Sequence, residues 1–182
     1  SCGGLVSSFV ESSPTCAQLP DGCHETVVPW HIFTNDMGYG DILSTISAGV
    51  ASQKQTDKCK VSILSGTGGL FSIAPKLPSI DAYLVLDNNV FVHKAIQTAL
   101  SLLLASNSRI EYLEKLRTCD MSRQVCKSGG DPLEWLKLEQ LAFGDQHFLN
   151  SHKQFEETKE ALGRVRLLHY LVDLTNAQSV QV

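Results

Sequence analysis

The sequence contains no run of Lys and Arg residues and no long hydrophobic segment. Nucleic acids and anionic membrane surfaces are bound through clustered positive charge, so the absence of a basic run argues against both. The formal net charge of −4 and the pI of about 5.8 agree with this. The longest apolar stretch, TALSLLLAS, is far shorter than the roughly 20 residues of a membrane-spanning helix. We therefore expect no nucleic-acid partner and no membrane span.

Several short motifs of catalytic and metal sites are also absent. There are no CxxC or HxxxH pairs of the kind that bind zinc, and His147 and His152 are five positions apart rather than four. The absence of GxxxxGK[ST] excludes a P-loop, and the absence of G-x-S-x-G leaves a serine hydrolase without support. We expect no metal ligands in this chain.

Six cysteines are present, and two pairs of them share the spacing C-x6-C: Cys16 with Cys23, and Cys119 with Cys126. In a secreted protein each pair would form a local disulfide, whereas in a cytosolic protein the thiols would be free. The sequence predicts a cytoplasmic protein. A secreted or lipid-anchored protein stays open, given the six cysteines and the Ser1-Cys2 start.

The 182 residues are enough for one domain with a substantial core, and 43% of them are hydrophobic. Residues 1–30 are expected to form an irregular arm, and residues 107–162 to be mainly helical. Short apolar runs predict buried strands at 59–64, 82–86 and 165–174. Intervening patterns predict helices at 70–77, 90–105 and 133–162, the last interrupted at Gly144, with a further helix capped by Ser108 and Glu111. Residues 1–182 are thus predicted to be a single α/β domain. Its Rossmann-like, mostly parallel sheet would be flanked by helices, with a helical insertion after the second strand.

Polar and glycine residues follow each predicted strand. Ser65-Gly66-Thr67-Gly68-Gly69 follows the first strand, Asp87-Asn88-Asn89 the second, and Asp173-Leu174-Thr175-Asn176 the third. In an open parallel sheet the ligand crevice lies outside the carboxyl ends of the strands. Glycines there let the backbone approach a ligand closely, and a carboxylate after the second strand can accept hydrogen bonds from a ribose diol.

The glycine pattern narrows the class of ligand. It is GTGG rather than GxGxxG, which argues against a dinucleotide because the pyrophosphate needs the full motif. Gly69 and Asp87 are 18 positions apart, close to the roughly 20 of ribose-binding arrangements. A nucleoside cofactor without a pyrophosphate fits best.

Over about residues 38–106 the chain resembles the class I S-adenosylmethionine-dependent methyltransferases. The resemblance implies that Gly66, Gly68 and Gly69 line the methionine and ribose portions of S-adenosyl-L-methionine, and that Asp87 holds the ribose hydroxyls. It also implies that Asn88 lies near the adenine. The segment DLTN takes the place of the fourth-strand motif beside the transferred methyl group, so that Asp173 is the candidate general base. The cofactor-binding residues expected on this basis are Ser65, Gly66, Thr67, Gly68, Gly69, Asp87, Asn88 and Asn176.

Other interpretations of the same residues stay open. GTGG is compatible with a tight strand–helix turn, Asp87 with a helix N-cap, and Asp173 and Asn176 with a turn. A methyltransferase-like domain without catalysis could serve as an interaction or scaffold module, and a different nucleotide could bind the same fold. The methyl acceptor is either a small molecule or a protein and is not identified by the sequence, nor is the oligomeric state.

Overall fold

A three-stranded parallel sheet forms the centre of the computed structural model of this chain. The structure describes residues 43, 45, 46, 48, 49, 59–65, 69–118 and 132–171. Strands β1 (Val61–Ser65), β2 (Ala82–Asp87) and β3 (Arg166–Leu171) pair side by side in the order β1-β2-β3. The predicted α/β class with a parallel sheet is therefore confirmed.

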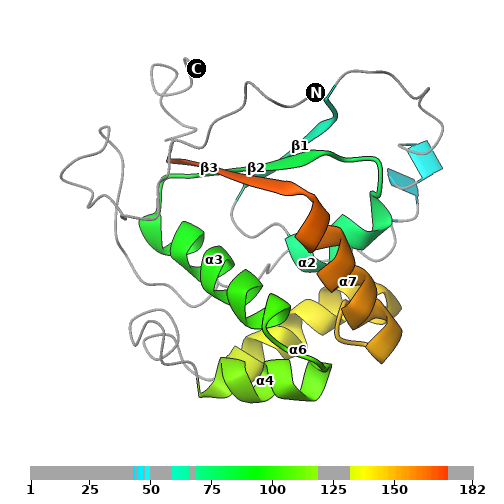
Figure 1. The fold of residues 1–182 in the computed structure, drawn as a ribbon, viewed down its shortest axis with the longest axis vertical. Coiled ribbons are helices and arrows are strands. Elements are labelled where there is room, and N and C mark those ends of the chain that lie inside the picture. Colours follow the sequence, from blue (N-terminus) through cyan, green and yellow to red (C-terminus); the bar gives the residue numbers. More distant parts are fainter. Residues whose placement is uncertain are drawn as a thin grey trace.

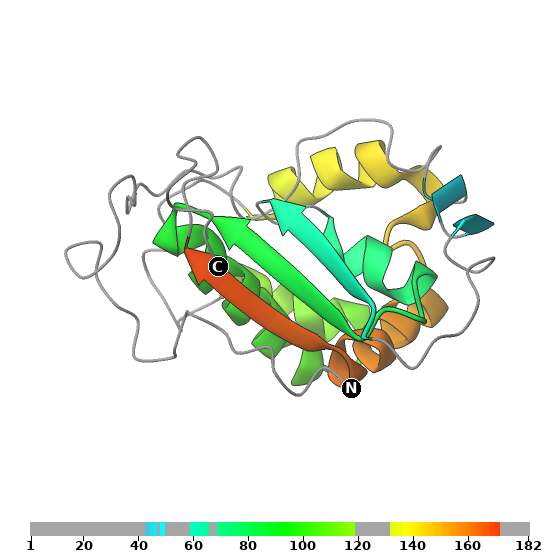
Figure 2. The same cartoon turned by 90° about the horizontal axis from the view of Figure 1, so that it is seen from above.

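Helices lie beneath this sheet, on one of its sides (Figure 1). Seen from above, the three strands run in the same direction, with α3 and α4 behind them and α6 to the side, beyond β1 (Figure 2). Within the described part of the chain, the helices with defined bounds are α2 (Leu70–Ile73), α3 (Val90–Leu104), α4 (Arg109–Arg117), α6 (Pro132–Phe143) and α7 (His152–Arg164), together with the short 3₁₀ turns η3 (Ala74–Lys76) and η4 (Gly144–Gln146).

The main core lies between the sheet and these helices. Leu64 of β1 and Tyr83 and Val85 of β2 pack with α3, α4 and α7 in one buried cluster. In-register partners of a parallel sheet leave the same face, so His169 of β3, which pairs with Val85, also faces the helices. The apolar stripe of α3 was predicted correctly at Val92, Ile96, Ala99 and Leu103, which are buried. The prediction was wrong at Leu104, which is 45% exposed because α3 ends there.

The position of β3 in the sheet bears on the role expected for the segment that follows it. In a doubly wound sheet of order 3-2-1-4, a fourth strand pairs with the first and a third strand pairs with the second. Here β3 pairs with β2 along its whole length, so it takes the position of a third strand. The role expected for the DLTN segment stays a prediction, because the structure describes the chain only to Leu171. Asp173 and Asn176 themselves lie outside the described residues.

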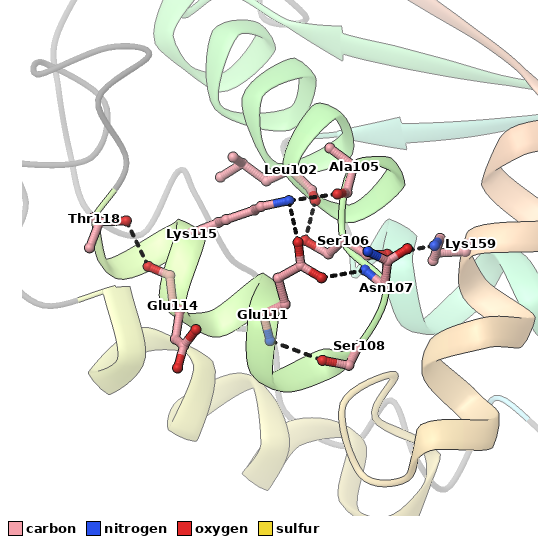
Figure 3. A network of polar contacts seen from close by, with 10 residues as sticks. All are labelled: Leu102, Ala105, Ser106, Asn107, Ser108, Glu111, Glu114, Lys115, Thr118 and Lys159. Atoms are coloured by element: carbon pink, nitrogen blue, oxygen red, sulfur yellow. Dashed lines mark hydrogen bonds and ion pairs between the residues drawn. The ribbon is translucent and has the colours of Figure 1, made fainter.

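The junction between α3 and α4 is fixed by a network of polar contacts (Figure 3). The Ser108 hydroxyl accepts the backbone N–H of Glu111 at 3.2 Å, which confirms the predicted N-cap. The Glu111 carboxylate accepts the backbone N–H of Asn107 at 2.7 Å and pairs with Lys115, which also donates to the Ala105 carbonyl. From α7, Lys159 donates to the Ser106 carbonyl, so the helices are joined at this corner.

We expect Ser108→Ala to lower the free energy of unfolding by about 1 kcal/mol, because it removes the oxygen that satisfies a free N–H of the first turn of α4. Urea unfolding followed by circular dichroism measures this. Ser101→Ala, on the exposed side of α3, is the matched control and should change stability little. Equal effects of the two substitutions would contradict the capping role.

Candidate functional site

The carboxyl ends of β1 and β2 lie next to each other. Ser65 pairs with Leu86, so the backbones of Ser65 and Asp87 lie close together at the carboxyl end of the sheet. This is the arrangement that the strand order requires for a shared ligand crevice. Of the remaining loop residues, Gly66, Thr67 and Gly68 fall outside the described part of the chain. The structure thus brings together the two ends of the predicted constellation, Ser65 and Asp87.

Gly69 closes the glycine loop and begins α2. Its φ of 66° is in the left-handed region, where an L side chain is disfavoured. A Cβ at this position would lie 2.2 Å from Cζ of Phe143, so the aromatic ring of α6 packs directly on the glycine backbone. The Gly69 carbonyl accepts the N–H groups of Ser72 and Ile73. Glycine is required here both by the backbone conformation and by the close approach of another element.

Asp87 combines a structural contact with an available carboxylate oxygen. Its Oδ1 accepts the backbone N–H of Asn89 at 2.8 Å, immediately before α3, which gives the carboxylate a local role at the helix start. Its side chain is only partly buried, and its Oδ2 has no hydrogen-bond partner among the residues that the structure describes. Asn88 is also partly buried, whereas Asn89 is fully buried. Oδ2 of Asp87 is therefore the oxygen that could accept a ligand hydroxyl.

Two buried histidines contact each other, one of them also contacts this aspartate, and the sequence did not predict the pair. Nδ1 of His93, on α3, lies 2.9 Å from Nδ1 of His169, on β3. Nε2 of His93 lies 3.1 Å from the backbone carbonyl of Asp87. A carbonyl only accepts, so in a neutral ring His93 carries its proton on Nε2, and its Nδ1 accepts from the Nδ1–H of His169. The pair therefore links α3, β3 and the end of β2.

Burial keeps both rings neutral near pH 7. It lowers the pKa of His93, although the hydrogen bond to the Asp87 carbonyl and the charge of Asp87 act in the opposite direction. Burial, and secondly the repulsion from His93, lower the pKa of His169 to about 4. The two residues are 76 positions apart, and each lies in an apolar segment. No local spacing links them, which is why sequence patterns did not reveal the pair.

Within the described ranges, no group of three or more His, Cys, Asp or Glu side chains could hold a metal ion. Two surface grooves formed by described residues lie away from the strand ends. One, of about 420 Å³, is lined by residues of α4 and α6 together with Leu149, and the other, of about 640 Å³, runs along α7. Neither includes Ser65, Asp87 or the histidine pair, so the candidate site rests on the strand ends.

Cys59, just before β1, is disulfide-bonded. It belongs to neither C-x6-C pair, and the other five cysteines lie outside the described residues. Disulfides form in oxidising compartments and are rare in the cytosol.

Reduction is expected to raise the mass of the intact protein by two hydrogen masses for each bridge and to lower its melting temperature, because a disulfide typically contributes about 2–4 kcal/mol. Mass spectrometry with and without reductant and peptide mapping of the partner of Cys59 measure this. Cys59→Ser should show one bridge fewer than the unaltered chain. An unchanged mass on reduction would contradict the bond.

Comparisons with known proteins give no relative of this chain. No protein-family model, no curated protein and no solved structure matches it significantly. Among the described residues, none of the helices has the length and apolar character needed to cross a membrane.

Proposed function

We propose that the chain is an S-adenosylmethionine-dependent methyltransferase with a Rossmann-like sheet, whose cofactor lies at the carboxyl ends of β1 and β2. The observation that carries this proposal is the position of Asp87. Asp87 ends β2 next to the end of β1 at Ser65, and its carboxylate keeps one oxygen without a described partner. A ribose diol needs such an acceptor at this point of an open parallel sheet.

The residues at this edge suit a nucleoside cofactor. Asp87 would accept the ribose hydroxyls, and Asn88 would lie near the adenine. The glycine loop from Ser65 to Gly69, with Thr67 in its middle, would let the backbone approach the ribose and methionine portions. S-adenosyl-L-methionine would supply an activated methyl group, and catalysis would consist mainly of aligning the acceptor with it.

The neutral His93–His169 pair supports this site from the side of the sheet that faces the helices. Nε2–H of His93 donates a hydrogen bond to the backbone carbonyl of Asp87, and this bond holds the end of β2 in place next to the proposed ligand-binding carboxylate. Asp173 stays the proposed general base, with Asn176 as a contact to cofactor or acceptor. Because β3 pairs with β2 rather than β1, the topology gives this part of the proposal less support than it gives Asp87. The acceptor would be a small molecule or a protein side chain.

A second candidate is a non-catalytic methyltransferase-like interaction or scaffold module. It is favoured by one observation: among the described strands, none pairs with β1 on the side away from β2, where a doubly wound sheet would place its second half. For the compartment, the disulfide at Cys59 supports the secreted alternative over the cytoplasmic one.

Isothermal calorimetry with S-adenosylmethionine and S-adenosylhomocysteine tests the proposal. We expect both ligands to bind, and Asp87→Ala to weaken binding roughly 10- to 150-fold, because charged hydrogen bonds contribute about 1.5–3 kcal/mol. Asp81→Ala is the matched control. Asp81 lies just before the opposite end of β2, where it accepts the N–H of Lys60, and its loss should leave affinity unchanged.

No binding of either ligand at high micromolar concentration would reject the methyltransferase and favour the scaffold module. Binding that survives Asp87→Ala unchanged would show that the cofactor lies elsewhere on the chain.

A further inference from the structure

The groove between α4 and α6 has the apolar lining of a small-molecule site. Its volume of about 420 Å³ falls within the roughly 300–1,000 Å³ that ligand sites occupy. Four aliphatic side chains line it: Ile110, Leu113, Leu136 and Leu149. Leu136 and Leu149 are 3% and 5% exposed and belong to the main core, whereas Ile110 is 65% exposed. The groove thus combines a buried apolar floor with an apolar rim that is open to solvent.

The polar residues of this groove carry charge of one sign. They are Arg109, Lys137 and Gln140, and no Asp or Glu is among the described residues that line the groove. The chain as a whole has a formal net charge of −4, so two cations without a carboxylate form a local positive region. An anionic group is attracted to such a region, and charge complementarity favours a negatively charged ligand over a neutral or a cationic one.

The guanidinium group of Arg109 is held in one orientation by the protein. Its Nη1 donates to the backbone carbonyls of Leu149 and Asn150, at 3.1 Å and 2.9 Å, and these two bonds use both N–H groups of Nη1. The opposite edge of the guanidinium, formed by Nε–H and one N–H of Nη2, has no partner in the described part of the chain. Two parallel N–H groups of this kind match the two oxygens of a carboxylate.

We propose that the groove between α4 and α6 binds a carboxylate that carries an unbranched alkyl chain of medium length. The carboxylate accepts two hydrogen bonds from the Nε–Nη2 edge of Arg109, and Lys137 adds positive charge to the groove. The alkyl chain lies on the aliphatic floor and against Ile110. An apolar lining with a few polar groups that fix the orientation is the usual composition of a small-molecule site.

The lining favours an alkyl chain over an extended peptide. A peptide needs hydrogen-bond partners for its backbone, and Gln140 is the one uncharged polar side chain among the described residues of the lining. An alkyl chain needs no such partner, and by covering Ile110 it removes an exposed apolar side chain from water. The groove includes neither Ser65 nor Asp87, so this ligand site is independent of the function proposed for the strand ends.

Titration of the ¹⁵N-labelled full chain with sodium decanoate, followed by ¹H–¹⁵N NMR, tests the site. We expect shifts confined to α4, α6 and the Leu149 segment, including the Nε–H signal of Arg109. Octanoate should bind up to roughly 15-fold more weakly, since each buried methylene changes affinity about fourfold. Decanol, which has the same chain without the charge, should bind at least about tenfold more weakly. No shift at about 1 mM decanoate, equal binding of decanol, or shifts that follow protein concentration alone would overturn the proposal.

Substitutions at the rim locate the carboxylate without disturbing the core. Ile110→Glu adds a negative charge at an exposed position and should weaken decanoate binding at least about tenfold, whereas Ile110→Lys should weaken it less. Arg109→Lys keeps the charge but loses the paired N–H groups, and should weaken binding roughly 5- to 10-fold. Leu138→Glu, at an exposed leucine of α6 outside the groove, is the matched control. An equal loss with Leu138→Glu, or no loss with Ile110→Glu, would overturn the proposal.

Discussion

Gly69→Ala is expected to lower the free energy of unfolding by about 2–5 kcal/mol. The left-handed backbone costs an L residue about 1–2 kcal/mol, and forcing atoms into a packed core costs about 1–3 kcal/mol more. Both costs apply here, since φ is 66° and the new Cβ would lie 2.2 Å and 2.7 Å from two ring atoms of Phe143. Urea unfolding of the two proteins gives the difference. If the proposed function is correct, cofactor affinity falls as well.

Gly144 provides the control for backbone strain alone. Its φ is 53°, but a Cβ there would meet nothing within 4 Å. Gly144→Ala should therefore lower the free energy of unfolding only by the cost of the left-handed backbone, about 1–2 kcal/mol. The double substitution Gly69→Ala with Phe143→Leu should lose less stability than the sum of the two single changes, because the smaller side chain makes room. Equal losses for Gly69→Ala and Gly144→Ala would show that the ring moves aside without cost.

The sequence predicts the sheet well because its signals are local. Strands 59–64 and 82–86 differ from the observed Val61–Ser65 and Ala82–Asp87 by one or two residues. The helix predicted at 70–77 is observed as α2 followed by the 3₁₀ turn η3, which contains Pro75. Apolar β-branched runs and capping residues act within a few positions of the chain. What they do not encode is which edge of β2 receives β3. That depends on packing between segments about 80 positions apart.

In the candidate site, too, residues that belong to a local sequence pattern could be predicted, and contacts made only by the fold could not. Asp87 could be predicted because a carboxylate after a strand, at a suitable distance from a glycine loop, is a pattern along the chain. The His93–His169 pair could not, because burial and the fold alone bring the two rings together. The packing of Phe143 on Gly69 is likewise a contact across the fold, and glycine in the sequence reveals the need for space without revealing its occupant.

Acidification is the second change with a large expected effect. The folded pKa of His169, about 4, lies below its ordinary value of 6.5, so the unfolded chain takes up the proton first. Stability is therefore full above about pH 6.5, falls as the pH is lowered toward 4, and loses nothing further from this group below that. The depression corresponds to about 3 kcal/mol. The lowered pKa of His93 acts in the same direction.

His169→Asn isolates this contribution. An amide can still donate to Nδ1 of His93 but cannot take up a proton, so the variant should be somewhat less stable at pH 7.5 and lose less of its stability by pH 4. His152→Asn, at the exposed start of α7, should keep the full pH dependence. Urea unfolding at half-unit steps between pH 7.5 and 4 measures the slopes. Parallel slopes for His169→Asn and the unaltered chain would show that protonation of His169 does not contribute to the loss of stability in acid and that other groups control it. A shallower slope in His169→Asn alone would place the acid sensitivity of the fold beside Asp87, at the strand ends where the ligand is proposed to bind.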